Sequence, residues 1–337
     1  MKSTLASLPT PDLSDDQFLG AVCALRPCRH GGPRLEIENI GLKTIVHNYG
    51  HGGCGVTISL GSAQIAADLV DQCSTPKAHV AILGAGVIGL TTAIELLNRG
   101  YTVDVYADKI AHDTTSNIAG ALWLPMAIEF GNTIKDEELK SRLLVQSHRA
   151  FQELDRARYG LELLPIYEPA ESDTELGLFG HLFDHGLVEL PEEVDAFPFQ
   201  SAAKPGQRFT TDFIHMHLFL DAILEDIAKL GGVIHQRKIT TQEELAEFNQ
   251  PVVVNCLGLG ARGLFGDKQV YSARGVLVHM KPQDLGYGIH DGFKYMFPRK
   301  NALILGGCCQ EYDWDDEPDQ VMIDEILNHH RRFFGQL

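Results

Sequence analysis

The sequence predicts an α/β protein that combines a nucleotide-binding fold with a second lobe. Two short apolar strands are each followed by a cluster of glycines and then by an amphipathic helix. The length of 337 residues is sufficient for two average domains. Apolar residues make up 44% of the chain and charged residues 22%, which is the composition of an ordinary globular protein and not of a disordered one.

The first strand–loop–helix unit spans residues 44–73. Residues 44–49 (TIVHNY) form a β-rich run. The glycines that follow this run are Gly50, Gly52, Gly53 and Gly55. Apolar residues then recur at helical spacing over 57–73, and the pattern stops before Ser74.

The second unit repeats this order immediately. We expect a strand at 79–83, a glycine loop, a helix at 87–99 that Gly100 ends, and another strand at 102–106. Strands joined through helices should be parallel with right-handed crossovers, so both glycine loops should lie at the carboxyl edge of one sheet. We therefore expect the two loops to face one ligand.

The rest of the chain is less regular. A long polar segment at 135–159 and a Pro- and Glu-rich stretch to residue 206 are interpreted as part of the second lobe. A helix at 211–230 and a strand at 252–255 return to the α/β pattern. Further strands are expected at 275–280 and within 295–307.

The second glycine loop has dinucleotide-binding spacing. Gly84, Gly86 and Gly89 form G-x-G-x-x-G between a predicted strand and a predicted helix. These glycines allow a tight turn, close approach of a pyrophosphate, and helix–strand packing. Asp108 follows about 20 residues after the last glycine, just past the next predicted strand, where an acid can bind ribose hydroxyls. The motif predicts dinucleotide binding without separating NAD from FAD.

Composition excludes several kinds of partner. The formal charge of −17 disfavours nucleic acid and anionic lipid. We find no run of about 18 apolar residues, no secretory signal at the start and no peroxisomal signal at the end. Seven cysteines, an odd number, indicate reduced thiols. We expect a cytoplasmic protein without a membrane or nucleic-acid partner.

No metal site is predicted. His47 and His51 lie in strand and loop, where i, i+4 spacing does not converge on a metal ion. His215 and His217 are expected two apart on a helix and so on different faces. The pair Cys308 and Cys309 is interpreted as strand residues on opposite faces.

Several segments resemble the D-amino-acid oxidases and D-aspartate oxidases of the FAD-dependent DAO family. The matching segments, which together with shorter ones cover most of the chain, are 25–36, VHNYGHGGCGVTISLG at 46–61, VYADKIAHDTTSNIAGALWLP at 105–125, VVVNCLGLGARGLFGD at 252–267, and YMFP with LILGG within 295–307. The resemblance implies a Rossmann-like FAD-binding domain with a parallel sheet and an α+β substrate domain with a mainly antiparallel sheet. FAD is the implied cofactor.

The order of the segments departs from the family. The RP and NYGHGG segments close the chain in the family but precede the glycine loop here, so the sequence is expected to be circularly permuted. The resemblance divides the chain into an FAD-binding domain at 34–126 and 206–262, and a substrate domain at 1–33, 127–205 and 263–337. Leu124 replaces a polar residue, and 290–294 is shorter than the family's lid-like segment.

The resemblance also implies site residues. Arg26 would pair with the substrate carboxylate through its bidentate guanidinium, Tyr295 would contact the same carboxylate, and the Gly53 carbonyl would accept the substrate amine. Residue type alone favours the interpretation of Arg26 as a surface arginine in a turn before Pro27. The implied FAD-binding residues are Gly52, Gly53, Gly55, Val56, Thr57, Gly84, Gly86, Val87, Ile88, Gly89, Asp108, Lys109, Thr114, Thr115, Ser116, Ala121 and Leu122.

The implied activity is oxidative deamination of D-amino acids with O2 as acceptor, by hydride transfer to flavin and without an acid–base residue. Cys309 and His290 stand where D-aspartate oxidases carry arginines, which favours neutral substrates. The alternatives are a D-aspartate oxidase, an NAD-dependent dehydrogenase, and a flavin-binding protein without turnover. Oligomeric state stays open, with a homodimer among the options.

Overall fold

The computed structural model describes residues 7–75, 77–172, 182–183, 185–199 and 204–337. The chain divides into two compact units. Unit 1 comprises Met1–Leu25, Glu162–His215 and Arg274–Leu337. Unit 2 comprises Arg26–Leu161 and Met216–Ala273.

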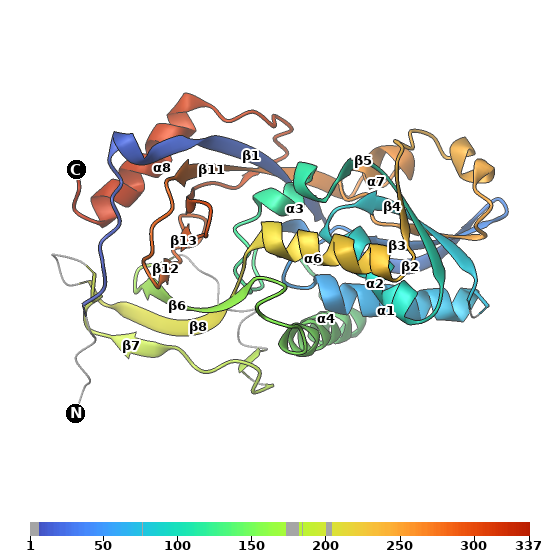
Figure 1. The fold of residues 1–337 in the computed structure, drawn as a ribbon, viewed down its shortest axis with the longest axis horizontal. Helices are drawn as coiled ribbons and strands as arrows, with labels where there is room; N and C mark the ends of the chain where they lie inside the picture. Colours follow the sequence, from blue (N-terminus) through green and yellow to red (C-terminus); the bar gives the residue numbers. More distant parts are fainter. Residues whose placement is uncertain (1–6, 76, 173–181, 184, 200–203) are drawn as a thin grey trace. The chain divides into compact units, whose positions relative to one another are not determined.

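Unit 2 is built on a six-stranded sheet in the order β2-β3-β10-β4-β5-β9 (Figure 1). Its strands are β2 (Arg34–Ile40), β3 (Lys43–Tyr49), β4 (His79–Ala85), β5 (Thr102–Ile110), β9 (Val233–Gln236) and β10 (Val252–Asn255). All neighbours are parallel except β2, which forms an antiparallel hairpin with β3. The predicted parallel sheet is confirmed, and both glycine loops follow its strands at the carboxyl edge. The sequence did not indicate that β10 lies between β3 and β4.

Helices of unit 2 connect these strands. They are α1 (Ser59–Cys73), α2 (Val87–Asn98), α3 (Thr115–Ile118), α4 (Ile134–Gln152), α6 (Met216–Lys229) and α7 (Gly260–Leu264), with 3-10 turns η2 (Gly52–Cys54), η3 (Ala111–Asp113) and η4 (Glu243–Glu247). α4 packs closely on α1 at Gly61, where a Cβ would lie only 2.5 Å from the Ser147 hydroxyl. α1 begins two residues later than the apolar spacing predicts.

A nine-stranded sheet forms the framework of unit 1. Its main path runs β1-β11-β14-β13-β12-β6-β8-β7, and β15 also pairs with β11. The strands are β1 (Phe18–Arg29), β6 (Leu161–Pro169), β7 (Glu192–Val194), β8 (Gly206–Ile214), β11 (Val270–Met280), β12 (Gly288–Ile289), β13 (Met296–Pro298), β14 (Leu303–Gly306) and β15 (Gln310–Glu311), and the helices are η1 (Asp15–Gln17) and α8 (Gln320–Phe333). Four of its pairings are antiparallel and β12–β6 is parallel, so a mainly antiparallel second sheet is confirmed.

The two faces of this sheet differ. Met296 and Leu305 belong to the large apolar core, together with Ile326 of α8. Because side chains alternate along a strand, Tyr295 and Phe297 lie on the opposite face. That face carries the residue predicted to contact the substrate.

Three predictions about local structure are wrong. Residues 211–214 are the end of β8 and not the start of a helix, because β-sheet pairing overrides helical spacing there. Asp108 lies inside β5 and not after it. Cys308 and Cys309 lie between β14 and β15 and not within a strand.

Candidate functional site

The loop between β4 and α2 is shaped by two glycines that accept no side chain. Gly84 has a φ of +104°, and a Cβ there would lie 2.5 Å from the Cys256 carbonyl oxygen. A Cβ at Gly89 would lie 1.9 Å from the Gly84 carbonyl oxygen. The glycines therefore allow β10 and the first turn of α2 to approach the end of β4, as the dinucleotide motif requires.

The threonine-rich stretch lies beside this loop. The Ser116 hydroxyl accepts a hydrogen bond from the Val87 backbone N–H at 2.9 Å. A Cβ at Gly86 would lie 3.2 Å from that hydroxyl and 3.9 Å from the Thr114 hydroxyl. Gly86, Val87, Thr114 and Ser116, four residues predicted to bind the cofactor, thus lie together at the N-terminus of α2, where backbone N–H groups and the helix dipole favour phosphate.

The loop after β3 brings together another predicted group. The Gly53 N–H donates to the Ala127 carbonyl oxygen at 2.8 Å. A Cβ at Gly52 would lie 2.4 Å from that oxygen. A Cβ at Gly53 would lie 3.3 Å from Cδ of Arg26, which is half-buried at the end of β1 and not in a turn.

The start of α1 contacts both the segment at Leu124 and helix α2. The Thr57 hydroxyl donates to the Leu124 carbonyl oxygen at 3.2 Å. The Thr91 hydroxyl of α2 lies 2.8 Å from the Val87 carbonyl oxygen of its own helix and 3.3 Å from the carbonyl oxygen of Ser59, the first residue of α1. The start of α1 and the helix of the dinucleotide motif are therefore held against each other.

The remaining predicted cofactor residues lie on these segments. Ala121 has a φ of +60° and, like Leu122, is buried. Gly55 and Val56 lie in the turn between η2 and α1, Ile88 and Thr115 lie in the first turns of α2 and α3, and Lys109 is exposed on β5. Asp108 is also exposed, and its Oδ2 lies 3.1 Å from the Lys238 ammonium.

The two histidines near the loop after β3 have structural partners. His47 Nε2 lies 2.8 Å from Glu38 Oε2, and its Nδ1 lies 3.1 Å from the Asn255 amide. His51 Nε2 lies 2.7 Å from the Ser62 hydroxyl, and burial lowers the pKa of His51 to about 3. Across the described residues, no three His, Cys, Asp or Glu side chains are grouped to hold a metal ion.

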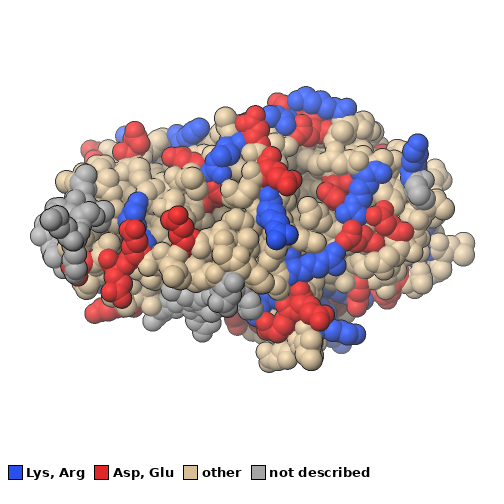
Figure 2. Space-filling view, turned by 90° about the horizontal axis from the view of Figure 1, so that it is seen from below, with Lys and Arg blue, Asp and Glu red and all other residues tan. Residues whose placement is uncertain are grey.

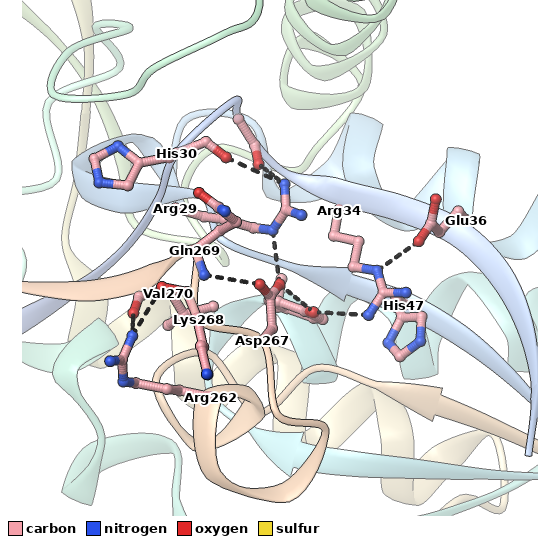
Figure 3. A network of polar contacts seen from close by, with 12 residues as sticks. Arg29, His30, Arg34, Glu36, His47, Arg262, Asp267, Lys268, Gln269 and Val270 are labelled. Carbon is pink, nitrogen blue, oxygen red and sulfur yellow. Dashed lines mark hydrogen bonds and ion pairs between the residues drawn. The ribbon is translucent and has the colours of Figure 1, made fainter.

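A partly buried polar network that the sequence did not predict supports the loop after β3 (Figure 3). Asp267 Oδ2 accepts hydrogen bonds from Arg29 Nε at 2.8 Å and from the Tyr49 hydroxyl at 2.7 Å. Arg34 in turn donates to the Tyr49 hydroxyl at 3.2 Å. A Cβ at Gly50 would lie 2.8 Å from Arg29 Cβ, so this network packs directly on the first glycine of the loop.

In unit 1, Tyr295 is half-buried and its ring stacks on Phe297, with centroids 4.7 Å apart. His290 is buried, and its Nδ1 lies 3.6 Å from Glu168 Oε1. Arg299 is also buried and interacts electrostatically with Tyr295. Burial lowers the pKa of Arg299 to about 10, which leaves its guanidinium charged at neutral pH.

Most of the chain matches a known protein family. A model of the FAD dependent oxidoreductase family, DAO, matches residues 79–337. The chain belongs to this family. The DAO-family protein is an oxidoreductase whose cofactor is FAD. The loop fits that cofactor because Gly84 and Gly89 allow the tight turn and the close packing of α2, while Gly86 leaves the backbone open to a pyrophosphate.

Individual relatives agree with this assignment. A D-amino-acid oxidase from Streptomyces coelicolor is 33% identical over 277 residues, which cover 74% of this chain and 75% of the relative. A D-aspartate oxidase from Homo sapiens is 29% identical over 274 residues, covering 74% of each chain. The predicted permuted order of the DAO-family protein stays a prediction.

Solved structures share the fold. Glycine oxidase from Geobacillus kaustophilus superposes with a TM-score of 0.55 at 17% identity, covering 75% of this chain and 78% of that one. Iminodiacetate oxidase from Chelativorans sp. BNC1 gives a TM-score of 0.55 at 14% identity, covering 77% and 79%. At these identities the likeness concerns the fold of the DAO-family protein.

The surface carries charges of both signs. On the face drawn in Figure 2, acidic and basic side chains alternate over the described residues without a continuous basic patch. Among the described helices of the DAO-family protein, none is long and apolar enough to cross a membrane.

Proposed function

We propose that this protein oxidises D-amino acids, with a preference for neutral side chains, to 2-oxo acids, ammonia and H2O2. The observation that carries the proposal is the contact of Arg26 with Gly53 in the glycine loop of unit 2. It places the side chain of Arg26, whose guanidinium would suit a substrate carboxylate, beside Gly53, whose backbone carbonyl would suit a substrate amine. The relatives named D-amino-acid oxidase support the substrate class.

Bound FAD supplies the redox chemistry, by accepting a hydride from the substrate Cα and passing two electrons to O2. Arg26 would hold the carboxylate through two parallel N–H bonds and so fix the Cα. The carbonyl of the exposed Gly53 would accept the substrate amine. The resemblance to D-amino-acid oxidases implies that the Tyr295 hydroxyl also binds the substrate carboxylate. Backbone N–H groups at residues 55–57, just before α1, would stabilise negative charge on the cofactor.

The preference for neutral side chains rests on the charges around the predicted side-chain pocket. Cys309 stands where D-aspartate oxidases carry an arginine, and it supplies no cation. His290 stands at the second arginine position, but it lies beside the buried Glu168 carboxylate. Any positive charge on His290 is therefore balanced within the protein, and neither of these two positions supplies a cation for a second substrate carboxylate.

D-aspartate oxidation is the second candidate, and one observation favours it. Arg299 is only 5% exposed and interacts electrostatically with Tyr295. A buried, charged guanidinium is a suitable partner for a second carboxylate. If the protein is a D-aspartate oxidase, replacing Arg299 with Met would abolish its activity on D-aspartate. If it prefers neutral substrates, as we propose, the variant would still be more active on D-alanine than on D-aspartate.

The decisive experiment is a peroxide-coupled assay with purified protein over D- and L-amino acids. We expect H2O2 from neutral D-amino acids and none from their L-enantiomers. A flavin absorption spectrum excludes the NAD-dependent alternative, and anaerobic bleaching of that spectrum by D-alanine excludes a protein without turnover. Bound flavin without bleaching by any D-amino acid would refute the proposed function.

Three further expectations belong to this proposal. We assign FAD binding to residues 34–126 and 206–262 and substrate binding to residues 1–33, 127–205 and 263–337. We retain the permuted order of these segments. A cytoplasmic location is supported by the seven cysteines, none of which forms a disulfide.

A further inference from the structure

The ring of Tyr295 occupies the space that a side chain at position 306 would need. Pairing of Met296 with Leu305 places Tyr295, the residue before β13, opposite Gly306, the last residue of β14. The Gly306 N–H donates to the Tyr295 carbonyl oxygen at 2.7 Å. A Cβ at Gly306 would lie 2.4, 2.5 and 2.6 Å from Cζ, Cε2 and Cε1 of the ring. The ring therefore lies flat over the glycine backbone.

A second surface confines the same ring. Phe297 lies two residues along the strand and stacks on Tyr295 with an interplanar angle of 13°. Phe297 is itself buried and contacts Phe213 of β8, with ring centroids 5.7 Å apart. The position of Phe297 is thus fixed by the sheet, and it closes one side of the space available to Tyr295.

The glycine backbone under the ring is held from α8. His330 is buried, and its Nε2 lies 3.2 Å from the Gly306 carbonyl oxygen. Burial lowers the pKa of His330 to about 3, so the imidazole is neutral and donates one N–H to this oxygen. A Cβ at Gly307 would lie 2.0 Å from Ile326, so α8 also packs directly on the next residue.

We propose that Gly306 and Phe297 are positioning residues that fix the hydroxyl of Tyr295 for binding the substrate carboxylate, and that His330 holds Gly306 in place. This inference rests on the proposed function. A tyrosine whose ring is confined on two sides presents its hydroxyl in one direction without losing further side-chain freedom on binding. Misplacing such a group by about 1 Å reduces its effect up to a hundredfold.

The first test is Gly306→Ala, which forces the Tyr295 ring to move. We expect KM for D-alanine to rise about tenfold to a hundredfold, with the content and spectrum of FAD unchanged. Tyr295→Ala removes the ring, so adding Gly306→Ala to that variant should raise KM no further. An equal rise in KM in both backgrounds would overturn the proposal.

The second test compares two phenylalanines of unit 1. Phe297→Leu removes the ring that stacks on Tyr295. Phe199→Leu removes a ring that stacks on Tyr287 at 4.4 Å and 5° in the apolar core on the other face of the sheet. Both variants should lower Tm, but only Phe297→Leu should raise KM. A similar KM in the two variants would contradict the positioning role, and this comparison decides the matter if Gly306→Ala does not fold.

A third readout is independent of activity. Selective ¹³C labelling of tyrosine rings, with the Tyr295 signal assigned through Tyr295→Phe, reports the environment of this ring in the holoenzyme. We expect Gly306→Ala and Phe297→Leu to shift this signal and Phe199→Leu to leave it unchanged. If the wild type oxidises no D-amino acid, the proposed function fails, while the spectrum still decides whether the ring is confined. An unshifted signal in the first two variants would refute the inference.

Discussion

Arg26 lies against Gly53, with a Cβ at Gly53 placed 3.3 Å from Cδ of the arginine. The two residues come from different elements, β1 and η2. Gly53 is held in this position because its N–H donates to Ala127. The contact gives Arg26 a defined side-chain direction, which a surface arginine in a turn would lack.

We expect Arg26→Ala to raise KM for D-alanine strongly while leaving FAD bound. Loss of a bidentate contact with a desolvated carboxylate costs about 2–5 kcal/mol of binding free energy. Arg26→Lys should recover part of this at most, because an ammonium group lacks the planar fork. Steady-state kinetics check this expectation, with Arg142→Ala, which changes an exposed arginine of α4, as the control. An unchanged KM in Arg26→Ala would contradict the site assignment.

Gly89→Ala should yield a destabilised protein without bound FAD. The new Cβ would meet the Gly84 carbonyl oxygen at 1.9 Å, so β4 and α2 must separate, at a cost of about 3 kcal/mol or more. Gly263→Ala is the matched control, since a Cβ in that helical position meets no atom within 4 Å. Thermal unfolding and the flavin absorbance should change in the first variant and not in the second.

Asp267→Asn should lower the free energy of unfolding by about 1–3 kcal/mol at neutral pH. Burial opposes ionisation of Asp267, but hydrogen bonds from Arg29 and Tyr49 outweigh it and hold the pKa of the carboxyl below its usual value. This stabilisation is therefore present above about pH 4 and is lost as pH falls through the lowered pKa. Denaturant unfolding of the wild type and the variant between about pH 7 and 3 should show that their difference in free energy of unfolding becomes smaller in acid. A difference that does not change with pH would contradict a stabilising role for the Asp267 charge.

Selectivity should follow the charge at position 309. The wild type should show a higher kcat/KM for D-alanine and D-methionine than for D-aspartate. Cys309→Arg should raise the D-aspartate to D-alanine ratio about tenfold or more, by supplying a partner for the second carboxylate. Cys73→Arg, at the end of α1, is the control for an added arginine elsewhere. A wild type that prefers D-aspartate would favour the Arg299 alternative.

FAD should be bound without a covalent link. Cys54 lies in the glycine loop, but it is fully buried, and burial raises the pKa of its thiol to about 12. The reactive thiolate is therefore nearly absent at neutral pH. Acid precipitation should release all yellow colour to the supernatant, and colour that remains in the pellet would contradict this expectation.

Local sequence determined the parts of this protein that depend on neighbouring residues. The strand–glycine–helix units around Gly53 and Gly84 follow from apolar periodicity and from glycines at turns, and they match β3–α1 and β4–α2 within about two residues at their helix starts and ends. The dinucleotide spacing alone indicated which glycines must lack a side chain, because close backbone approach is a property of the turn itself.

Only the tertiary structure decided which distant segments meet. β10 lies between β3 and β4, residues 211–214 form sheet pairs that override their helical spacing, and Tyr49 bonds to Asp267 across 218 positions of sequence. The position of the Tyr295 ring likewise depends on Gly306 of β14 and on His330 of α8. Such contacts leave no periodic signal, because strand register and side-chain burial are set by packing between segments and not by the preferences of any one of them.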